Sequence, residues 1–473
     1  MQKKNLEKVD IIVIGSGLSA LNFIDTYLEK KKIINVISPK NFTTPGINTS
    51  KEKKILPAQM KGEHKDVLNY FASNNLLLDS NCKVLGSLNR GGLSDYWGLQ
   101  LDSHFTKDQK HLNKITFNAI ENNFLEFLNK YKLLGSFYKK NKIIYKNDYE
   151  VPHFLNELIT AKDKNFVCKK PLLAFSTNNT KNIELGTLKE EKTKINSSNF
   201  FKKINKKNNI IFHDYYVEKI ESKNNQIILF CRNKTKLKKI IAKKVVFASG
   251  TIATTKIIMD YLNIRHEVKV SHHQRLFSVF FSRTPINYKL LFTPSLIQIT
   301  KKLKKNYFSA DLRPGNKLIT NSIIDAFPFM KLFKSILNFI RHRLLFSNIL
   351  LDPSYSNVFI KKEGNKFKIY SKNQNTIKTL RQNNYKVFKF LFKNKVIYPF
   401  FKTFYPGPGA DYHYFGTIPF NNKGKLSVNN KCQLKKCKNI YVIDGSVFDF
   451  KTNKYPLGFV IANARRIGKL LSK

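Results

Sequence analysis

Two stretches near opposite ends of the chain contain residue types that are suited to chemistry. In "IIVIGSGLSAL", Gly15, Gly17 and Ala20 have the spacing of a glycine-rich phosphate-binding turn. In "DYHYFGTIPF", His413 stands three residues before a Gly-Thr pair, in a chain with only 10 histidines. Histidine titrates near neutral pH and often serves as a general base. The alternative for His413 is an ordinary core or surface histidine.

The glycine-rich turn lies between a predicted buried strand, residues 11–14, and a predicted helix that begins near Leu18. Gly15 permits the tight turn, Gly17 lets the backbone approach a pyrophosphate, and Ala20 allows the helix to pack on the strand. Free N–H groups at the helix N-terminus favour an anion there. The alternative is a chance glycine turn. We predict a dinucleotide site formed by Gly15, Ser16, Gly17, Leu18, Ser19 and Ala20.

The second strand of such a unit usually ends in an Asp or Glu that binds the adenosine ribose, roughly 20 residues after the turn. Here the strand in "KIINVISPK" is followed by Ser38. A hydroxyl can bond to a ribose, although less strongly than a carboxylate does. We therefore assign the ribose position to Ser38.

The segment "SLNRGGLSDYWGLQL" combines two adjacent glycines with the only tryptophan of the chain. Gly91 and Gly92 allow close approach of the backbone to a ligand, and Ser94 offers a hydroxyl to phosphate oxygens. The alternative is a plain Gly-Gly turn beside a core tryptophan.

Two later segments repeat the order of strand, turn and helix. "AKKVVFASGTIATTKIIMDYL" predicts a buried strand, a turn at Gly250 and a helix. "CKNIYVIDGSVF" predicts a strand over 440–443 and a turn at Asp444 and Gly445, and Pro456 then suits the start of an amphipathic helix. Open α/β sheets bind ligands at such strand ends.

Taken in order, "VIGSGLSA", "NRGGLSDYWG", "VVFASGTIATTKII", "YHYFGT" and "NIYVIDGSVF...YPLGFVIANARRIG" resemble the glucose-methanol-choline family of FAD-dependent oxidoreductases. The two ends and residues 245–259 carry the resemblance, whereas 106–180 and 263–405 match in length and general texture. It implies oxidation of the CH–OH group of an alcohol or sugar-like donor, with hydride transfer to flavin N5. Because "NRGGLSDYWG" contains no histidine, we expect FAD to be noncovalent.

The resemblance also assigns catalytic roles. The family's His-x-x-Gly-Thr motif falls on His413, Gly416 and Thr417, which implies that His413 takes the alcohol proton. Relatives carry a second His or Asn just before the proline of the last helix, and this chain has Tyr455 there, before Pro456. Tyrosine donates a hydrogen bond but is much less basic than histidine. A flavin-binding protein with lost or altered catalysis is therefore the alternative function.

The remaining cofactor contacts that the resemblance implies are made by backbone. The N-terminus of the last helix, Pro456 and Leu457, would face the flavin where negative charge gathers on reduction. The turn at Asp444 and Gly445 would contact the ribityl or pyrophosphate part, and Val217 the adenine. The predicted cofactor set also contains Ser38, Gly91, Gly92, Ser94 and Gly250.

The predicted fold is α/β, with a Rossmann-like FAD-binding domain assembled from discontinuous segments 1–105, 196–262 and 411–473. Segments 106–195 and 263–410 form an α+β substrate-binding cap that contains an antiparallel sheet. The first cap segment starts with helical spacing and continues as a Lys/Asn-rich stretch that we expect to be loose. The length of the whole chain, 473 residues, suits more than one domain.

The formal net charge of +52 would normally suggest nucleic acid or an anionic membrane as partner. The lysines are spread along the whole chain without a nucleic-acid-binding motif, so we expect a small alcohol or sugar-derived substrate and no specific nucleic acid. The sequence does not indicate the electron acceptor. Five scattered cysteines predict neither a disulfide framework nor a metal site. We expect His272 and His273 to be structural, and the alternative is that one of them lines the pocket. The absence of a long apolar run favours a cytoplasmic protein.

Residues 327–351, "FPFMKLFKSILNFIRHRLLFSNILL", combine apolar residues at helical spacing with Lys and Arg. Such a stretch is either a helix packed on its own domain or a peripheral contact to an anionic membrane. The apolar stripe consists of Phe329, Phe333, Ile336, Leu337, Ile340 and Leu344.

Overall fold

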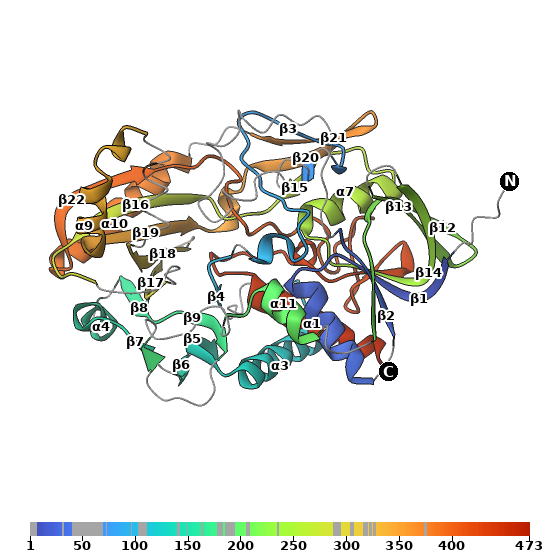
Figure 1. Ribbon diagram of the computed structural model, residues 1–473, viewed down its shortest axis with the longest axis horizontal. Helices are drawn as coiled ribbons and strands as arrows, with labels where there is room; N and C mark the ends of the chain where they lie inside the picture. Colours follow the sequence, from blue (N-terminus) through green and yellow to red (C-terminus); the bar gives the residue numbers. More distant parts are fainter. Residues whose placement is uncertain are drawn as a thin grey trace.

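The structure is a computed structural model of mixed α/β architecture, with several sheets and helices (Figure 1). It describes residues 7–30, 33–39, 70–71, 73–95, 97–102, 111–139, 142–147, 149–161, 163, 165–176, 183–184, 194–204, 209–233, 236–286, 295–302, 307–315, 320, 324, 328–372 and 376–473.

The largest sheet has eight strands and draws them from three separated parts of the chain. Its main order is β11-β2-β1-β14-β13-β12, with β24 beside β14 and β23 beside β24. The strands β11, β2, β1, β14 and β24 run parallel, so their carboxyl ends meet at one edge. The bounds are β1 (Glu7–Ile14), β2 (Ile34–Ile37), β11 (Ile210–His213), β12 (Tyr216–Lys223), β13 (Gln226–Asn233), β14 (Lys236–Phe247), β23 (Gln433–Leu434) and β24 (Cys437–Val442).

Helices α1 (Leu18–Tyr27), α3 (Lys114–Tyr131) and α11 (Leu457–Leu471) pack together beside this sheet (Figure 1). The α1–α11 contact is close: a Cβ on Gly468 would lie 2.1 Å from Thr26 Oγ1. Buried Asp25 of α1 accepts hydrogen bonds from Arg465 of α11 and Lys130 of α3, at 3.0 and 2.7 Å. Helix α7 (Thr251–Tyr261) follows β14 and packs against β12.

A six-stranded antiparallel sheet forms the other end of the molecule, in the order β22-β16-β19-β18-β17-β8 (Figure 1). Helix α10 (Thr376–Lys393) packs against β16, β19 and β22, and α4 (His153–Thr160) against β8. The bounds are β8 (Phe166–Lys169), β16 (Arg275–Ser282), β17 (Ile297–Lys302), β18 (Tyr307–Pro314), β19 (Leu344–Leu351) and β22 (Ile397–Phe404).

Three small sheets and short helices complete the described chain. The sheets are β15 (Val268–Val270)-β20 (Val358–Glu363)-β21 (Lys366–Ser371)-β3 (Leu76–Leu78), β4 (Gln100–Leu101)-β9 (Leu172–Ser176)-β5 (Leu133–Lys139)-β6 (Lys142–Asn147), and β10 (Ile183–Glu184)-β7 (Tyr149–Glu150). The helices are α6 (Ser197–Ile204), α9 (Lys334–Ile340), η1 (Leu28–Lys30), η3 (Gly92–Asp95), η6 (Pro328–Lys331), η7 (Arg341–Arg343), η8 (Pro353–Tyr355) and η9 (Gly445–Val447).

Two expectations about local structure are wrong. The Lys/Asn-rich stretch after α3 is not loose in its described part, because it contains β5, β6, β8, β9 and α4. The stripe from Phe329 to Leu344 is not one helix: α9 covers only Lys334–Ile340, and Leu344 begins β19. Parts of both stretches form strands of the six-stranded sheet instead. There β8 pairs with β17, and β19 pairs with β16.

The strands of the eight-stranded sheet fall within the three predicted cofactor segments, and those of the six-stranded sheet within the predicted cap. However, β3 and β4, from the first cofactor segment, pair with strands of the predicted cap. The domain boundaries stay a prediction. Within the described chain, no helix has the length and apolar character needed to cross a bilayer.

Candidate functional site

One cavity extends along the carboxyl edge of the parallel strands to the N-terminus of α11. The volume of this cavity is about 240 Å³, and the cavity is partly open to solvent. All predicted site residues except Ala20 line it: Gly15, Ser16, Gly17, Leu18, Ser19, Ser38, Gly91, Gly92, Ser94, Val217, Gly250, His413, Asp444, Gly445, Tyr455, Pro456 and Leu457. What each of them binds stays a prediction.

Ala20 is fully buried in α1. This suits the small residue that was expected to let the helix pack closely on the strand. It is therefore a packing residue and not a lining one.

The turn after β1 needs glycine at its first position. Gly15 has φ +107°, and a Cβ there would lie 2.3 Å from the carbonyl oxygen of Ala248, at the end of β14. Its N–H donates to the carbonyl of Ile37 at 2.9 Å. The turn is thus wedged between the ends of two parallel strands, where no side chain fits.

The Gly-Gly segment lies over the N-terminus of α1. The Leu18 N–H donates to Ser94 Oγ at 3.0 Å, and the Gly91 N–H donates to Ser16 Oγ at 2.9 Å. Ser38 is buried, and its hydroxyl is 2.7 Å from that of Ser16. Ser38 would therefore share its hydroxyl between Ser16 and a ribose.

Several features of the cavity fit a bound dinucleotide. A Cβ on Gly92 or Gly250 would meet nothing within 4 Å, so both backbones border open space. The buried indole Nε1 of Trp97 and the hydroxyl of Tyr412 have no hydrogen-bond partner among the described residues, and both side chains line the cavity. A polar ligand would satisfy these groups, because buried polar atoms are normally paired.

Asp444 plays a local structural role as well. Its carboxylate accepts from Thr254 Oγ1 at 2.5 Å and from the Ser446 N–H at 3.1 Å, which caps η9. Burial raises the pKa of this carboxyl group, against the effect of these donors. The carboxylate therefore fixes the turn that carries Gly445 into the cavity.

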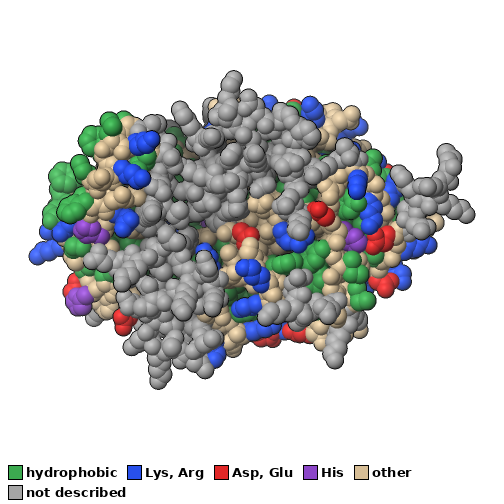
Figure 2. Space-filling view, in the orientation of Figure 1, with side chains coloured by type: hydrophobic (Ala, Val, Ile, Leu, Met, Phe, Trp, Pro, Cys, Tyr) green, Lys and Arg blue, Asp and Glu red, His purple; other side chains and the backbone are tan. Residues whose placement is uncertain are grey.

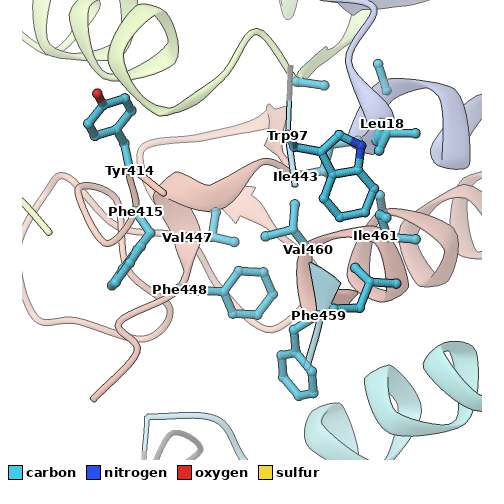
Figure 3. Close-up of a cluster of buried hydrophobic side chains, with 14 of the residues drawn as sticks. Leu18, Trp97, Tyr414, Phe415, Ile443, Val447, Phe448, Phe459, Val460 and Ile461 are labelled. Atoms are coloured by element: carbon cyan, nitrogen blue, oxygen red, sulfur yellow. The ribbon is translucent and has the colours of Figure 1, made fainter. Parts of the chain in front are cut away.

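The segment that carries His413 is irregular, but it is firmly held. Phe415 and Ser271 exchange two backbone hydrogen bonds of 2.9 and 3.0 Å. The Tyr414 hydroxyl donates to the Gly409 carbonyl at 2.7 Å. Aromatic packing continues beneath the segment, where Phe448 meets Phe459 of α11 with ring centroids 5.7 Å apart (Figure 3).

The Nδ1 side of His413 faces other side chains of the protein. His413 Nδ1 is 3.3 Å from His273 Nδ1 and 3.4 Å from Asp411 Oδ1. Asp411 is buried and forms an ion pair with buried Arg275. His273 Nε2 is 3.2 Å from the carbonyl oxygen of Thr452.

These contacts define the tautomers. A carbonyl oxygen only accepts, so Nε2 of His273 carries the proton toward Thr452. Neutral His273 then has a bare Nδ1, which accepts from the Nδ1–H of His413. This leaves the Nε2 of His413 as an unprotonated acceptor.

Burial keeps both rings neutral. It lowers the pKa of His413 to about 4, although the Asp411 carboxylate opposes this shift, and Arg275 adds to it. Burial and the neighbouring His413 lower the pKa of His273 to about 3. Burial would raise the pKa of Asp411, but Arg275 and then His413 outweigh it, so this pKa lies below its usual value.

Tyr455 lies edge-on to His413, with ring centroids 4.9 Å apart. Its hydroxyl donates to Asp311, whose other oxygen accepts from Gln100 Nε2 at 3.1 Å. Burial raises the pKa of Asp311 and, together with the Asp311 charge, raises the pKa of Tyr455 well above its usual value. The tyrosine therefore stays protonated.

Three of these residues, Arg275, Asp311 and Asp411, were not considered from the sequence. His273 was expected to be structural, with a place in the pocket as the alternative for it or His272. Asp411 stood two positions before His413, which was the one available signal. The others are far from His413 in the chain.

His273, Asp411 and His413 offer ligand atoms within 4.8 Å of one another, a geometry compatible with a metal ion. However, the Arg275 guanidinium already pairs with the carboxylate, and a cation there would be repelled. The sequence predicted no metal, and that stays a prediction.

No protein-family model matches the chain, and no curated protein matches its sequence. Among 683 solved chains that match the structure is pyridoxine 4-oxidase from Mesorbium loti. The comparison covers 98% of this chain and 99% of that one, with a TM-score of 0.58 and 11% identity. At this identity the likeness shows a shared fold.

Proposed function

We propose that the protein is an FAD-dependent oxidoreductase that acts on the CH–OH group of an alcohol or sugar-like donor. The observation that carries the proposal is a cavity that is lined both by His413 and by the predicted cofactor residues from the two ends of the chain. The fold shared with pyridoxine 4-oxidase supports the same reaction class. The motif resemblance, found independently from the sequence, points the same way.

FAD would be bound noncovalently in a Rossmann-like arrangement. The N-terminus of α1, with Gly15 and Gly17, would hold the diphosphate, and Ser38 and Val217 would lie at the adenosine end. The N-terminus of α11, at Leu457, would lie at the flavin. Among the described residues that line the cavity there is no cysteine and no histidine other than His413, which supports noncovalent binding.

When bound, the flavin supplies a hydride acceptor. The residues of the chain must then remove the hydroxyl proton while the carbinol carbon loses its hydride. The bare Nε2 of neutral His413 suits this step, because a base must be unprotonated before it reacts. Asp411 stabilises the imidazolium that forms, and His273 fixes the ring tautomer.

Tyr455 favours the alternative function, a flavin-binding protein with lost or altered catalysis. Its hydroxyl proton is directed to Asp311, so its oxygen is left to accept a hydrogen bond. Relatives with His or Asn at this position have a different hydrogen-bonding capacity. Under the main proposal His413 is the base, and Tyr455 accepts a hydrogen bond from a substrate group other than the reacting hydroxyl.

The visible spectrum of the purified protein, recorded anaerobically before and after addition of alcohols, tests the proposal. The panel contains sugars, simple alcohols and pyridoxine. A flavin spectrum that is bleached by one of them is the expected result. Bound flavin that no alcohol reduces would favour the alternative, and a protein that also refuses added FAD would overturn both.

Variants test the base. His413→Ala should retain FAD and slow flavin reduction by roughly two to four orders of magnitude. His266→Ala, at an exposed histidine, is the matched control and should reduce at the wild-type rate. Equal rates for both variants would remove His413 from the mechanism.

A further inference from the structure

An exposed apolar surface lies at the far end of the six-stranded sheet. Leu332, just after η6, is 87% exposed, and Phe339 of α9 and Phe400 of β22 are 77% and 69% exposed. Figure 2 shows hydrophobic side chains gathered beside cationic ones at this end, where Figure 1 places α9, α10 and β22. We call the described surface of residues 328–343, 385–393 and 398–404 the aromatic-basic face.

The three elements of this face meet at Arg283. Its Nε donates to the carbonyl of Ile397, at the start of β22, at 3.1 Å. Its guanidinium lies over the rings of Phe392 of α10 and Tyr398 of β22, at 5.7 and 5.6 Å. Arg343, in η7 directly after α9, donates to the Arg283 carbonyl at 2.7 Å. The exposed apolar side chains therefore belong to one continuous corner of the molecule.

The charge of this region has one sign. Residues 328–351 and 376–404 together contain 11 Lys or Arg and no Asp or Glu. Elsewhere the chain mixes 32 acidic residues among its cations. The segments that form the aromatic-basic face thus carry exposed apolar side chains together with cations and no acidic residue.

The position in the sheet makes this exposure unusual. Among the described strands, β22 is an edge strand paired with β16, and it carries exposed Phe400 and Phe404. Edge strands normally avoid exposed apolar residues, because these promote aggregation. Large exposed apolar patches generally mark interaction sites.

The combination of residues discriminates between partners. A second copy of this chain would bring the same cations against each other, which disfavours a symmetric dimer. Nucleic acid would use the cations and aromatic rings but not the aliphatic side chains of Leu332 and Ile336. A bilayer with anionic headgroups uses both parts, since apolar side chains enter the headgroup boundary while cations stay at the phosphates.

We propose that the aromatic-basic face docks peripherally on a lipid bilayer that is rich in anionic headgroups. The docking is independent of the flavin chemistry, so it stands or falls apart from the proposed function. It develops the membrane alternative for residues 327–351 by adding α10 and β22 to the surface.

The full-length protein is tested by flotation with phosphatidylglycerol-containing vesicles and with purely zwitterionic vesicles, at about 0.1 M salt. Because a protein of net charge +52 is attracted to any anionic surface, the decisive comparison is between variants of equal charge. The test variant is Leu332→Ser/Phe339→Ser/Phe400→Ser. The control is Ile33→Ser/Ile115→Ser/Leu237→Ser, at comparably exposed apolar residues away from the face.

The expected result is binding of wild type and control to anionic vesicles, with a loss of roughly tenfold or more in partitioning for the test variant. All three proteins should show the same thermal unfolding midpoint, because every substituted side chain is exposed. Equal partitioning of all three would reduce the effect to bulk charge and overturn the proposal. The proposal would also be overturned if the test variant bound vesicles like the wild type but lost dimerisation or DNA binding that the control retains. Analytical ultracentrifugation measures dimerisation, and titration measures DNA binding.

Discussion

The two ends of the molecule differ in what they bury: one end buries charged groups, and the other exposes apolar side chains. At the carboxyl edge of the eight-stranded sheet, ionisable groups such as Asp411, Arg275 and His413 are largely removed from water. At the aromatic-basic face, side chains such as Phe400 are exposed to water, on segments that contain Lys and Arg but no acidic residue. Both arrangements cost stability, because one desolvates charge and the other hydrates apolar surface. Under the two proposals, a bound flavin and substrate at one end and a bilayer at the other would offset part of these costs.

The largest expected effect tests the buried ion pair at the cavity end. Asp411→Asn leaves the Arg275 guanidinium buried without its carboxylate, and we expect the free energy of unfolding to fall by about 3–5 kcal/mol. Urea unfolding measures it. Glu221→Gln, which breaks an exposed pair with Lys219, is the control and should cost less than about 1 kcal/mol. Equal decreases in the free energy of unfolding for the two variants would show that the buried ion pair contributes no more to stability than the exposed one.

The second effect concerns pH. Burial lowers the pKa of His272 to about 4, and the pKa values of His273 and His413 to about 3 and 4, all below the roughly 6.5 of an unfolded chain. Between these values the unfolded state binds more protons, so stability is lost as pH falls from about 6.5 toward 4. Each histidine contributes up to about 1.4 kcal/mol per pH unit.

Urea midpoints between pH 7.5 and pH 5 measure this slope. His272→Gln should reduce this slope by up to about 1.4 kcal/mol per pH unit, the contribution of one histidine, and it leaves His413 in place. A stability that does not change over this range in the wild type would show that the cavity end does not hold its histidines neutral.

A smaller effect tests the hydroxyl of Tyr455. Tyr455→Phe removes the donor to Asp311, which keeps its bond from Gln100, and we expect a loss of about 1–2 kcal/mol in stability. If the hydroxyl also contacts substrate, flavin reduction should slow by about tenfold at unchanged FAD content. Stopped-flow reduction and urea unfolding separate the two roles. A destabilised variant with the wild-type reduction rate would make Tyr455 a structural residue.

The smallest effect is expected at the opposite end. Phe400→Ser should change the free energy of unfolding by less than about 0.5 kcal/mol, because the side chain is already exposed. Phe280→Ala, on the neighbouring strand and 1% exposed, should cost about 3–5 kcal/mol in the same urea experiment. A large loss for Phe400→Ser would mean that this end is ordinary core.

The cavity end was largely predictable, because its turns are encoded locally. Gly15 and Gly250 each follow an apolar run and precede a helix, and Pro456 directly precedes α11. The polar network around His413 was not predictable, since His273, Arg275 and Asp311 meet partners 136 to 144 residues away in the chain. Periodicity carries no information about such contacts.

The aromatic-basic face was only partly visible in the sequence. Helical spacing suggested a stripe through Leu337 and Leu344, yet both are buried, whereas Leu332 and Phe339 outside the stripe are exposed. The helical spacing does not continue to Leu344, because α9 ends at Ile340 and Leu344 begins strand β19. Phe400 could not be assigned to the same surface until the pairing of β22 with β16 was known.

Strand β16 links the two ends, since Arg275 begins it at Asp411 and Ser282 ends it next to Arg283. A strand of this length separates its end residues by about 23 Å. It is hydrogen-bonded on both sides, to β19 and β22, which makes it a stiff spacer. If the face rests on lipid, the reacting carbon is held at a distance that the protein cannot shorten by bending. A substrate anchored in the same bilayer would then need a headgroup long enough to cover that reach.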